Sequence, residues 1–239
     1  MKEKIASLFS SIASSYDRMN DVMSFGQHTF WKAYFVEQLP WGTMPDPFVY
    51  LDMSCGSGDI GALVLQKAGA CAKDIVPLFV DPNPDMMVLG QEKVTDERIE
   101  WRCESAEDLT VESESVDLYT IAFGLRNVSD RGKALAQAFR VLTKGGAFFC
   151  LEFSHPSHPV VECAYHTYLK VLPLVGKVIA GQSEPYTYLG QSIRDFPSPA
   201  LISMELSQAG FKNIGHHMLS SGIVAIHWGY KQKEGERHK

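Results

Sequence analysis

Short runs of hydrophobic residues alternate along the chain with segments whose hydrophobic positions recur every three or four residues. The short runs predict buried strands at residues 48–53, 75–81, 99–103, 116–123 and 147–153. Helices are expected between them at 59–70, 84–92 and 132–142, the last ended by Lys144-Gly145-Gly146. This alternation predicts an α/β fold with a mostly parallel sheet and helices on both faces.

The last part of the chain departs from this alternation. A helical pattern at 198–209 precedes two strands, 214–219 and 223–228, which we expect to form an antiparallel pair that closes the sheet. Two segments also stand outside the alternation, an N-terminal helical lid at 1–45 and an insertion at 155–197, and such additions commonly cover a site on an α/β sheet. We expect one domain over residues 1–231, followed by a polar tail at 232–239.

Charge and cysteine usage narrow the function classes. The net charge of −6 comes from 28 acidic and 22 basic residues, which argues against nucleic acid as the partner. The five cysteines have no metal-binding spacing, so we expect no metal site and a reducing, cytoplasmic location. The most apolar stretch, 171–180, is too short to span a bilayer, and the N-terminus does not resemble a signal peptide.

A glycine-rich turn follows the first strand. Gly56, Gly58 and Gly61 match the G-x-G-x-x-G pattern of dinucleotide sites, so an oxidoreductase that binds NAD is one interpretation. Asp52 and Asp59 flank the turn, however, and two carboxylates would repel a pyrophosphate. The ammonium and sulfonium groups of S-adenosylmethionine are attracted by carboxylates. The turn therefore favours S-adenosylmethionine.

Polar residues after the second and third strands point to a nucleoside. Asp81 ends the second strand, where its carboxylate can accept hydrogen bonds from both ribose hydroxyls, although it could instead cap the following helix. Ser105 and Ala106 follow the third strand, where a side chain and backbone could contact an adenine edge. Neither feature distinguishes S-adenosylmethionine from a dinucleotide.

Several short stretches are ones that a generic methyltransferase has no reason to carry, above all Phe123-Gly124-Leu125-Arg126-Asn127-Val128. The others are Tyr16-Asp17-Arg18-Met19-Asn20-Asp21 with Ser24-Phe25-Gly26, Arg140-Val141-Leu142, Leu151-Glu152-Phe153-Ser154, Val171-Leu172-Pro173, Tyr188-Leu189 with Ser192-Ile193-Arg194, and Gly222-Ile223-Val224-Ala225-Ile226-His227. In these the chain resembles, over nearly its whole length, the ubiquinone/menaquinone biosynthesis C-methyltransferases, which methylate a ring carbon of a polyprenylated quinol.

The resemblance implies a class I methyltransferase fold with seven strands and S-adenosylmethionine as cofactor. There are departures: Ser54-Cys55-Gly56-Ser57-Gly58 replaces the usual A-G-G-T-G, Ser105 replaces Asn, and Ala122 stands where Ser is common. Two of these remove possible polar contacts to the cofactor. Together, the turn and the resemblance predict cofactor contacts from Asp52, Gly56, Ser57, Gly58, Asp81, Ser105, Ala106 and Ala122.

The acceptor half of the site is expected after the fourth strand. A ring carbon becomes nucleophilic only when a neighbouring hydroxyl loses its proton, which a quinol can do and a quinone cannot. We expect Arg126 to stabilise the developing phenolate, with Asn127 orienting the acceptor and Tyr16 of the lid bonding a quinol oxygen. The alternatives are a surface ion pair for Arg126 and lid packing for Tyr16.

Residues 165–188 are rich in Tyr, Leu, Val and Pro and poor in charge. They predict either a packed helix or an apolar lid for an isoprenoid tail, which would hold the protein peripherally at the inner membrane surface. The resemblance implies demethylmenaquinol, a 2-methoxy-6-polyprenyl-benzoquinol or both as the acceptor, and we expect the protein to act as a homodimer or within a quinone-biosynthesis complex. Two alternatives stay open: another small aromatic or lipid acceptor, and a non-catalytic member of such a complex.

Overall fold

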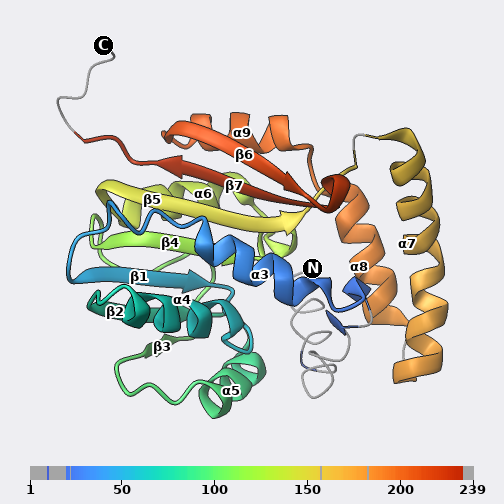
Figure 1. The fold of residues 1–239 in the computed structure, drawn as a ribbon, viewed down its shortest axis with the longest axis horizontal. Helices are drawn as coiled ribbons and strands as arrows, with labels where there is room; N and C mark the ends of the chain where they lie inside the picture. Colours follow the sequence, from blue (N-terminus) through green and yellow to red (C-terminus); the bar gives the residue numbers. More distant parts are fainter. Residues whose placement is uncertain (1–9, 11–19, 22, 157, 182, 234–239) are drawn as a thin grey trace.

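A twisted sheet runs through the computed structural model, which describes residues 10, 20, 21, 23–156, 158–181 and 183–233 (Figure 1). Its seven strands have the order β3-β2-β1-β4-β5-β7-β6. Pairing is parallel from β3 to β5, whereas β7 is antiparallel to both β5 and β6, so the predicted fold is confirmed. The strands are β1 (Phe48–Met53), β2 (Ile75–Val80), β3 (Glu100–Arg102), β4 (Val116–Ala122), β5 (Leu142–Phe153), β6 (Lys212–Leu219) and β7 (Val224–Tyr230).

Helices cover both faces of the sheet, as the alternation predicted (Figure 1). Trp31 and Phe35 of α3 pack with Ile60 of α4 in one hydrophobic cluster, while Leu135 of α6 packs with Leu206 of α9 in another. The sheet separates these two clusters, and burial of both stabilises the domain. The helices of these layers are α3 (Gln27–Glu37), α4 (Asp59–Ala70), α5 (Pro84–Lys93), α6 (Arg131–Val141) and α9 (Pro199–Gln208).

The fifth strand differs from the expectation. It begins at Leu142, directly after α6 ends at Val141, because the backbone of Leu142 is already extended (φ −66°, ψ 139°). The Lys144-Gly145-Gly146 sequence therefore does not end the helix. It lies inside β5, where the pairing with β4 shifts register.

The insertion forms two helices that lie side by side beyond the carboxyl ends of the parallel strands (Figure 1). They are α7 (Pro159–Ala180) and α8 (Glu184–Asp195). Gly176 of α7 lets the Tyr186 ring pack on the helix, since a Cβ there would lie 2.1 Å from that ring. Pro173 of α7 has no N–H to donate to the carbonyl of Leu169, and Gly190 of α8 lies beside that carbonyl. The close approach of α7 and α8 therefore depends on the two glycines, Gly176 and Gly190.

Gly61, the third glycine of the G-x-G-x-x-G match, has a packing role. A Cβ at this position would lie 1.9 Å from the Phe79 ring of β2, inside the buried layer between α4 and the sheet. The third glycine of the pattern is therefore explained by close contact between α4 and β2.

We predict that Gly61→Ala lowers the free energy of unfolding by about 1–3 kcal/mol, because the buried Phe79 ring has to move. Gly69→Ala, in the same helix with nothing within 4 Å of the added carbon, should instead stabilise by about 0.5–1 kcal/mol. Urea denaturation of the two variants measures both effects. Equal stability of the two would contradict the packing role.

Candidate functional site

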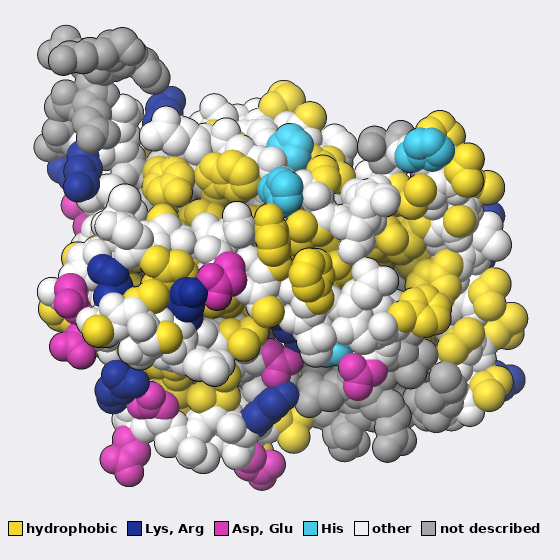
Figure 2. All heavy atoms as spheres, viewed as in Figure 1, with side chains coloured by type: hydrophobic (Ala, Val, Ile, Leu, Met, Phe, Trp, Pro, Cys, Tyr) yellow, Lys and Arg dark blue, Asp and Glu magenta, His cyan; other side chains and the backbone are white. Residues whose placement is uncertain are grey.

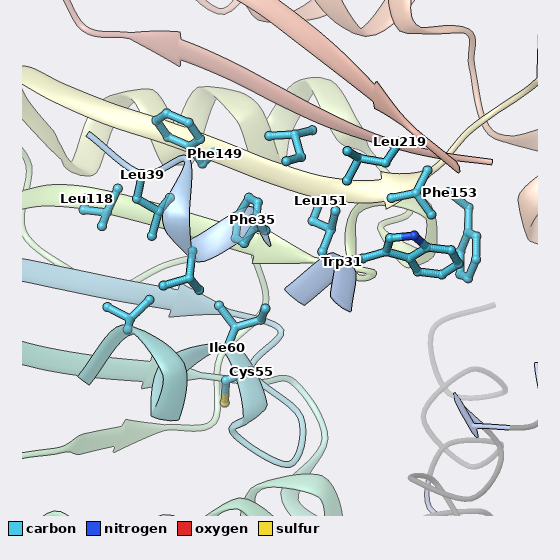
Figure 3. Close-up of a cluster of buried hydrophobic side chains, with 14 of the residues drawn as sticks. Trp31, Phe35, Leu39, Cys55, Ile60, Leu118, Phe149, Leu151, Phe153 and Leu219 are labelled. Atoms are coloured by element: carbon cyan, nitrogen blue, oxygen red, sulfur yellow. The ribbon is translucent and has the colours of Figure 1, made fainter. Parts of the chain in front are cut away.

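The turn after β1 is shaped by two glycines in the left-handed region, Gly56 (φ 54°) and Gly58 (φ 80°). The N–H of Gly58 donates to the carbonyl of Cys55 at 2.8 Å, which closes the turn before α4 begins. The Cys55 side chain is buried at the edge of the hydrophobic cluster, close to Ile60 (Figure 3). Burial raises the pKa of its thiol, so Cys55 acts here as a neutral core residue.

Asp52 lies buried near the end of β1 and faces α4. Its Oδ1 accepts a hydrogen bond from the Thr120 hydroxyl at 3.1 Å, and Oδ2 has no partner among the described residues. Burial raises the pKa of Asp52 to about 7, despite the opposing effects of Thr120 and the Gly61 N–H. A nearby cation would stabilise the ionised form of such a carboxyl group.

Asp81 follows β2, and its side chain is hydrogen-bonded to the backbone of the glycine turn. Its two oxygens accept hydrogen bonds from the N–H groups of Gly56 at 2.9 Å and Asn83 at 2.8 Å. Burial raises the pKa of Asp81 to about 6. The cap of α5 is Asn83, whose side chain accepts from the N–H groups of Asp85 and Met86, so Asp81 is not the helix cap.

Asp59 serves a different purpose from the one expected. Its carboxylate pairs with Lys32 of α3 at 2.6 Å and with Lys93 of α5 at 2.5 Å. Burial alone would raise its pKa, but the two lysines outweigh burial and lower it to about 2. Asp59 is therefore already neutralised by partners, and it joins α3, α4 and α5 rather than offering charge to a ligand.

The other predicted cofactor residues lie along the same edge of the sheet. Ser57 is buried within the glycine turn, and Ala122 is the last residue of β4, paired with Leu151. Beyond β3, the hydroxyl of Ser105 donates to Glu107 at 3.0 Å, while Ala106 is buried in the core. The structure thus gathers the predicted positions at the carboxyl ends of β1 to β4.

The loop after β4 touches the glycine turn directly. Phe123 adopts a left-handed backbone (φ 54°), and so does Ser54 in the turn (φ 56°). A Cβ at Gly124 would lie 2.5 Å from the Cβ of Ser54, so this position requires glycine. The short helix η2 (Leu125–Asn127) follows and carries the two predicted catalytic residues that the structure describes. Left-handed non-glycine residues store strain that the surrounding packing must hold.

Arg126 forms a buried ion pair with Glu152 of β5. The guanidinium Nη1 donates to Oε1 of Glu152 at 2.8 Å and also to the carbonyl of Phe123, and the two side chains are 6% and 0% exposed. Glu152 also accepts from the backbone N–H groups of Arg126 at 3.1 Å and Phe153 at 2.9 Å. The guanidinium lies 5.3 Å from the Phe153 ring centre. The alternative, an ion pair that holds the loop at the surface, is wrong in its location, because this pair is inside the protein, but the pair does hold the loop after β4.

Asn127 is held by α8. Its side-chain oxygen accepts from the Tyr188 hydroxyl at 3.0 Å, and its amide donates to the carbonyl of Phe123 at 3.4 Å. The third predicted catalytic residue, Tyr16, lies outside the described residues and its role stays a prediction.

A cavity of about 340 Å³ opens beside the Arg126–Glu152 pair. α3, α7, α8 and the ends of β5 and β7 surround it, and most of its walls are hydrophobic, with Phe25, Trp31, Phe153, Tyr165, Leu172 and Ile193 among them. Figure 3 shows Trp31 lying against Phe153 at the end of β5. The cavity can take an apolar molecule, and the Arg126 guanidinium packs on Phe153 in its wall.

Sequence reasoning assigned no role to three residues of this region: Glu152, Tyr165 and Tyr188. Glu152 could have been noticed, since it is a lone charge in the apolar strand pattern at 147–153, where a carboxylate has to be paired. Nothing in the local pattern distinguishes the two tyrosines, because their positions depend on how α7 and α8 fold back onto the sheet.

We predict that Arg126→Met alone lowers the free energy of unfolding by about 3–5 kcal/mol, since it leaves Glu152 buried without its cation. Adding Glu152→Gln should restore most of that stability, because no buried charge then remains. Urea denaturation of the two variants at one pH tests this. A double variant as unstable as the single one would show that the pair is not the cause.

Comparison with known proteins assigns the family. The ubiE/COQ5 methyltransferase family matches residues 1–231. The chain is 42% identical to the ubiquinone/menaquinone biosynthesis C-methyltransferase UbiE of Methylobacterium nodulans, covering 95% of this chain and 90% of that one. It is 37% identical to the mitochondrial 2-methoxy-6-polyprenyl-1,4-benzoquinol methylase of Oryza sativa subsp. japonica, covering 95% and 83%.

Solved structures share the fold at low sequence identity. A SAM-dependent methyltransferase of Aquifex aeolicus has a TM-score of 0.62 at 14% identity, covering 93% of this chain and 98% of that one. A Haemonchus contortus phosphoethanolamine N-methyltransferase in complex with S-adenosyl-L-methionine has a TM-score of 0.57 at 13% identity, covering 81% and 50%. From the match of sequence over nearly its whole length, this chain belongs to the ubiE/COQ5 methyltransferase family.

Proposed function

We propose that this protein transfers a methyl group from S-adenosylmethionine to a ring carbon of a polyprenylated quinol, as the names of its relatives indicate for those proteins. The proposal rests on where the acidic edge, the cavity and the buried ion pair lie relative to one another. A buried acidic edge, suited to a cationic nucleoside, is connected to an apolar cavity by the loop after β4, which packs on the glycine turn at Gly124 and on the cavity residue Trp31 through Phe123. The Arg126–Glu152 pair adjoins the same cavity through Phe153, whose ring packs on the guanidinium. Both demethylmenaquinol and a 2-methoxy-6-polyprenyl-benzoquinol fit this chemistry.

The residues at the acidic edge fit S-adenosylmethionine, which when bound supplies a methyl group activated by its sulfonium. Asp52 has an unpartnered buried oxygen and a raised pKa, and a neighbouring cation would relieve both. Asp81 accepts one N–H at each oxygen, which leaves lone pairs free to accept ribose hydroxyls. A dinucleotide would not be stabilised in this way, since its pyrophosphate would lie near both carboxyl groups and be repelled by them.

The acceptor ring would enter the cavity with its oxygens toward Arg126 and Asn127. The Arg126 guanidinium is a hydrogen-bond donor with no acceptor site, so it offers positive charge and does not act as a base. The phenolic proton would pass to water, the guanidinium would stabilise the phenolate oxygen left behind, and Glu152 keeps the guanidinium in place. Asn127, held by Tyr188, orients the ring, and Tyr16 is proposed to bond the second quinol oxygen.

We predict that the protein methylates a reduced quinol when it is incubated with methyl-labelled S-adenosylmethionine, and that the oxidised quinone gives no product. Calorimetric titration should show binding of S-adenosylmethionine and none of NADH. Asp81→Asn should weaken S-adenosylmethionine about tenfold or more through the lost carboxylate contact. Cofactor binding without methylation of any quinol would point to another acceptor, and no binding at all to a non-catalytic role in a complex.

α7 offers a surface for contact with the membrane that holds such substrates. Val160, Val171, Leu174 and Val178 project from its outer side, and Leu174 and Val178 are 66% and 86% exposed. Figure 2 shows hydrophobic side chains gathered along this edge of the molecule, over α7. Phe25, also exposed, lies in the wall of the cavity, so the apolar surface reaches the cavity itself. No helix of the described residues is long and apolar enough to cross a bilayer.

This surface supports the proposal that the protein sits peripherally on a bilayer with its outer α7 face in the lipid. An isoprenoid tail could then pass from the bilayer into the cavity without crossing water. The exposed lysines of α7, Lys170 and Lys177, would lie near the headgroups and favour anionic lipid.

We predict that Leu174→Asp with Val178→Asp reduces co-sedimentation with vesicles of phosphatidylglycerol and phosphatidylethanolamine by more than about tenfold, because both side chains are exposed and apolar. Methylation of a short-tail quinol should remain. The matched control is Leu201→Asp with Met204→Asp, two exposed residues of α9 away from the cavity. A change of oligomeric state in the α7 variant, with vesicle binding intact, would assign the surface to a second copy instead.

A further inference from the structure

Tyr165 lies on the inner side of α7 and its ring lines the cavity. The side chain is 8% exposed, and its hydroxyl is fully buried without a hydrogen-bond partner among the described residues. Buried polar groups in folded proteins nearly always have a partner, because leaving one unpaired costs free energy. An unpaired hydroxyl in a cavity wall therefore calls for an explanation.

The neighbours of Tyr165 explain its unpaired hydroxyl. Its hydroxyl lies within the electrostatic reach of both Arg126 and Glu152, whose charges act on its pKa in opposite directions. The Nε of Arg126 is likewise buried and unpartnered among the described residues, as is the hydroxyl of Ser154, which follows the cavity-lining Phe153. Three polar groups, from α7, η2 and the segment after β5, thus lack partners among the described residues, and each belongs to a residue that lines the cavity or adjoins its Phe153 wall.

We propose that the Tyr165 hydroxyl donates a hydrogen bond to the acceptor oxygen next to the carbon that is methylated. This role rests on the proposed function. As that oxygen loses its proton to water, the hydrogen bond from Tyr165 strengthens, and Tyr165 and Arg126 together stabilise the negative charge that makes the ring carbon nucleophilic. The hydroxyl has no exposed surface in this structure, so contact requires a small shift of the cavity wall.

Burial raises the pKa of Tyr165 far above its ordinary value, so the residue keeps its proton and acts as a donor, not as the base. Tyr168, one turn further along the same helix, also lines the cavity but differs from Tyr165. Its hydroxyl already donates to the carbonyl of Met23 at 2.9 Å. Tyr168 is therefore a structural tyrosine, and it provides a matched control.

The test compares Tyr165→Phe with Tyr168→Phe in the full chain, using a short-tail reduced quinol and S-adenosylmethionine. Tyr165→Phe should lower kcat about 10- to 100-fold, with cofactor affinity unchanged and the melting temperature equal or higher. The acid limb of its kcat–pH profile should also move about one unit upward, since the bound quinol loses a donor that favours its ionised form. Tyr168→Phe should lower the melting temperature and leave that limb in place.

Several outcomes separate this role from the function on which it rests. If the wild-type protein methylates a quinol and Tyr165→Phe matches it in kcat and pH profile, the role of Tyr165 is overturned and the function stands. A large drop in melting temperature for Tyr165→Phe would also overturn it, because the hydroxyl would then have a structural partner. Wild-type protein that binds S-adenosylmethionine but methylates no quinol would overturn the proposed function, and the role with it.

Discussion

The buried ion pair between Arg126 and Glu152 is the constraint on which the functional half of the structure depends. A carboxylate with no exposed surface needs both a cation and hydrogen bonds, and η2 supplies them through the Arg126 side chain and backbone N–H. This fastens the loop after β4 to the end of β5. The same loop packs against the glycine turn at Gly124 and against Trp31 of the cavity wall through Phe123, so it connects the turn to the cavity.

A second set of charges ties the covering segment to this frame. Asp59 starts α4 and pairs with Lys32 from α3 and Lys93 from α5. Because these three helices come from separate parts of the chain, one carboxylate aligns the lid helix with the glycine turn. Trp31, one residue before Lys32, then reaches the cavity and donates from its indole N–H to Ser220. Helix α3 is thereby tied both to the glycine turn and to the cavity wall.

Hydrophobic periodicity was sufficient for the sheet, because strands that are buried on both faces have few polar positions to obscure the pattern. It failed at the start of β5, where polar and glycine residues sit in a shifted part of a strand and look like a turn. It also identified the edge at which Asp52, Asp81, Ser105 and Ala122 meet, since parallel strands end on the same side. The charge reasoning was wrong for Asp59, whose partners come from elsewhere in the chain, and for Asp52 it stays a prediction.

The sequence by itself determined the fold class, the family and the position of the glycine turn, because each is carried by residues that are neighbours along the chain. Only the tertiary structure decided which carboxylates have partners, that Arg126 is buried against Glu152, and that Tyr165 lines a cavity while its buried hydroxyl has no partner among the described residues. These properties arise from contacts between β5, η2 and the α7–α8 pair, in which Arg126 meets Glu152 from 26 residues away and Asn127 meets Tyr188 from 61 residues away. Burial and pairing are set by all the segments that meet at one place, and a local pattern describes one segment at a time.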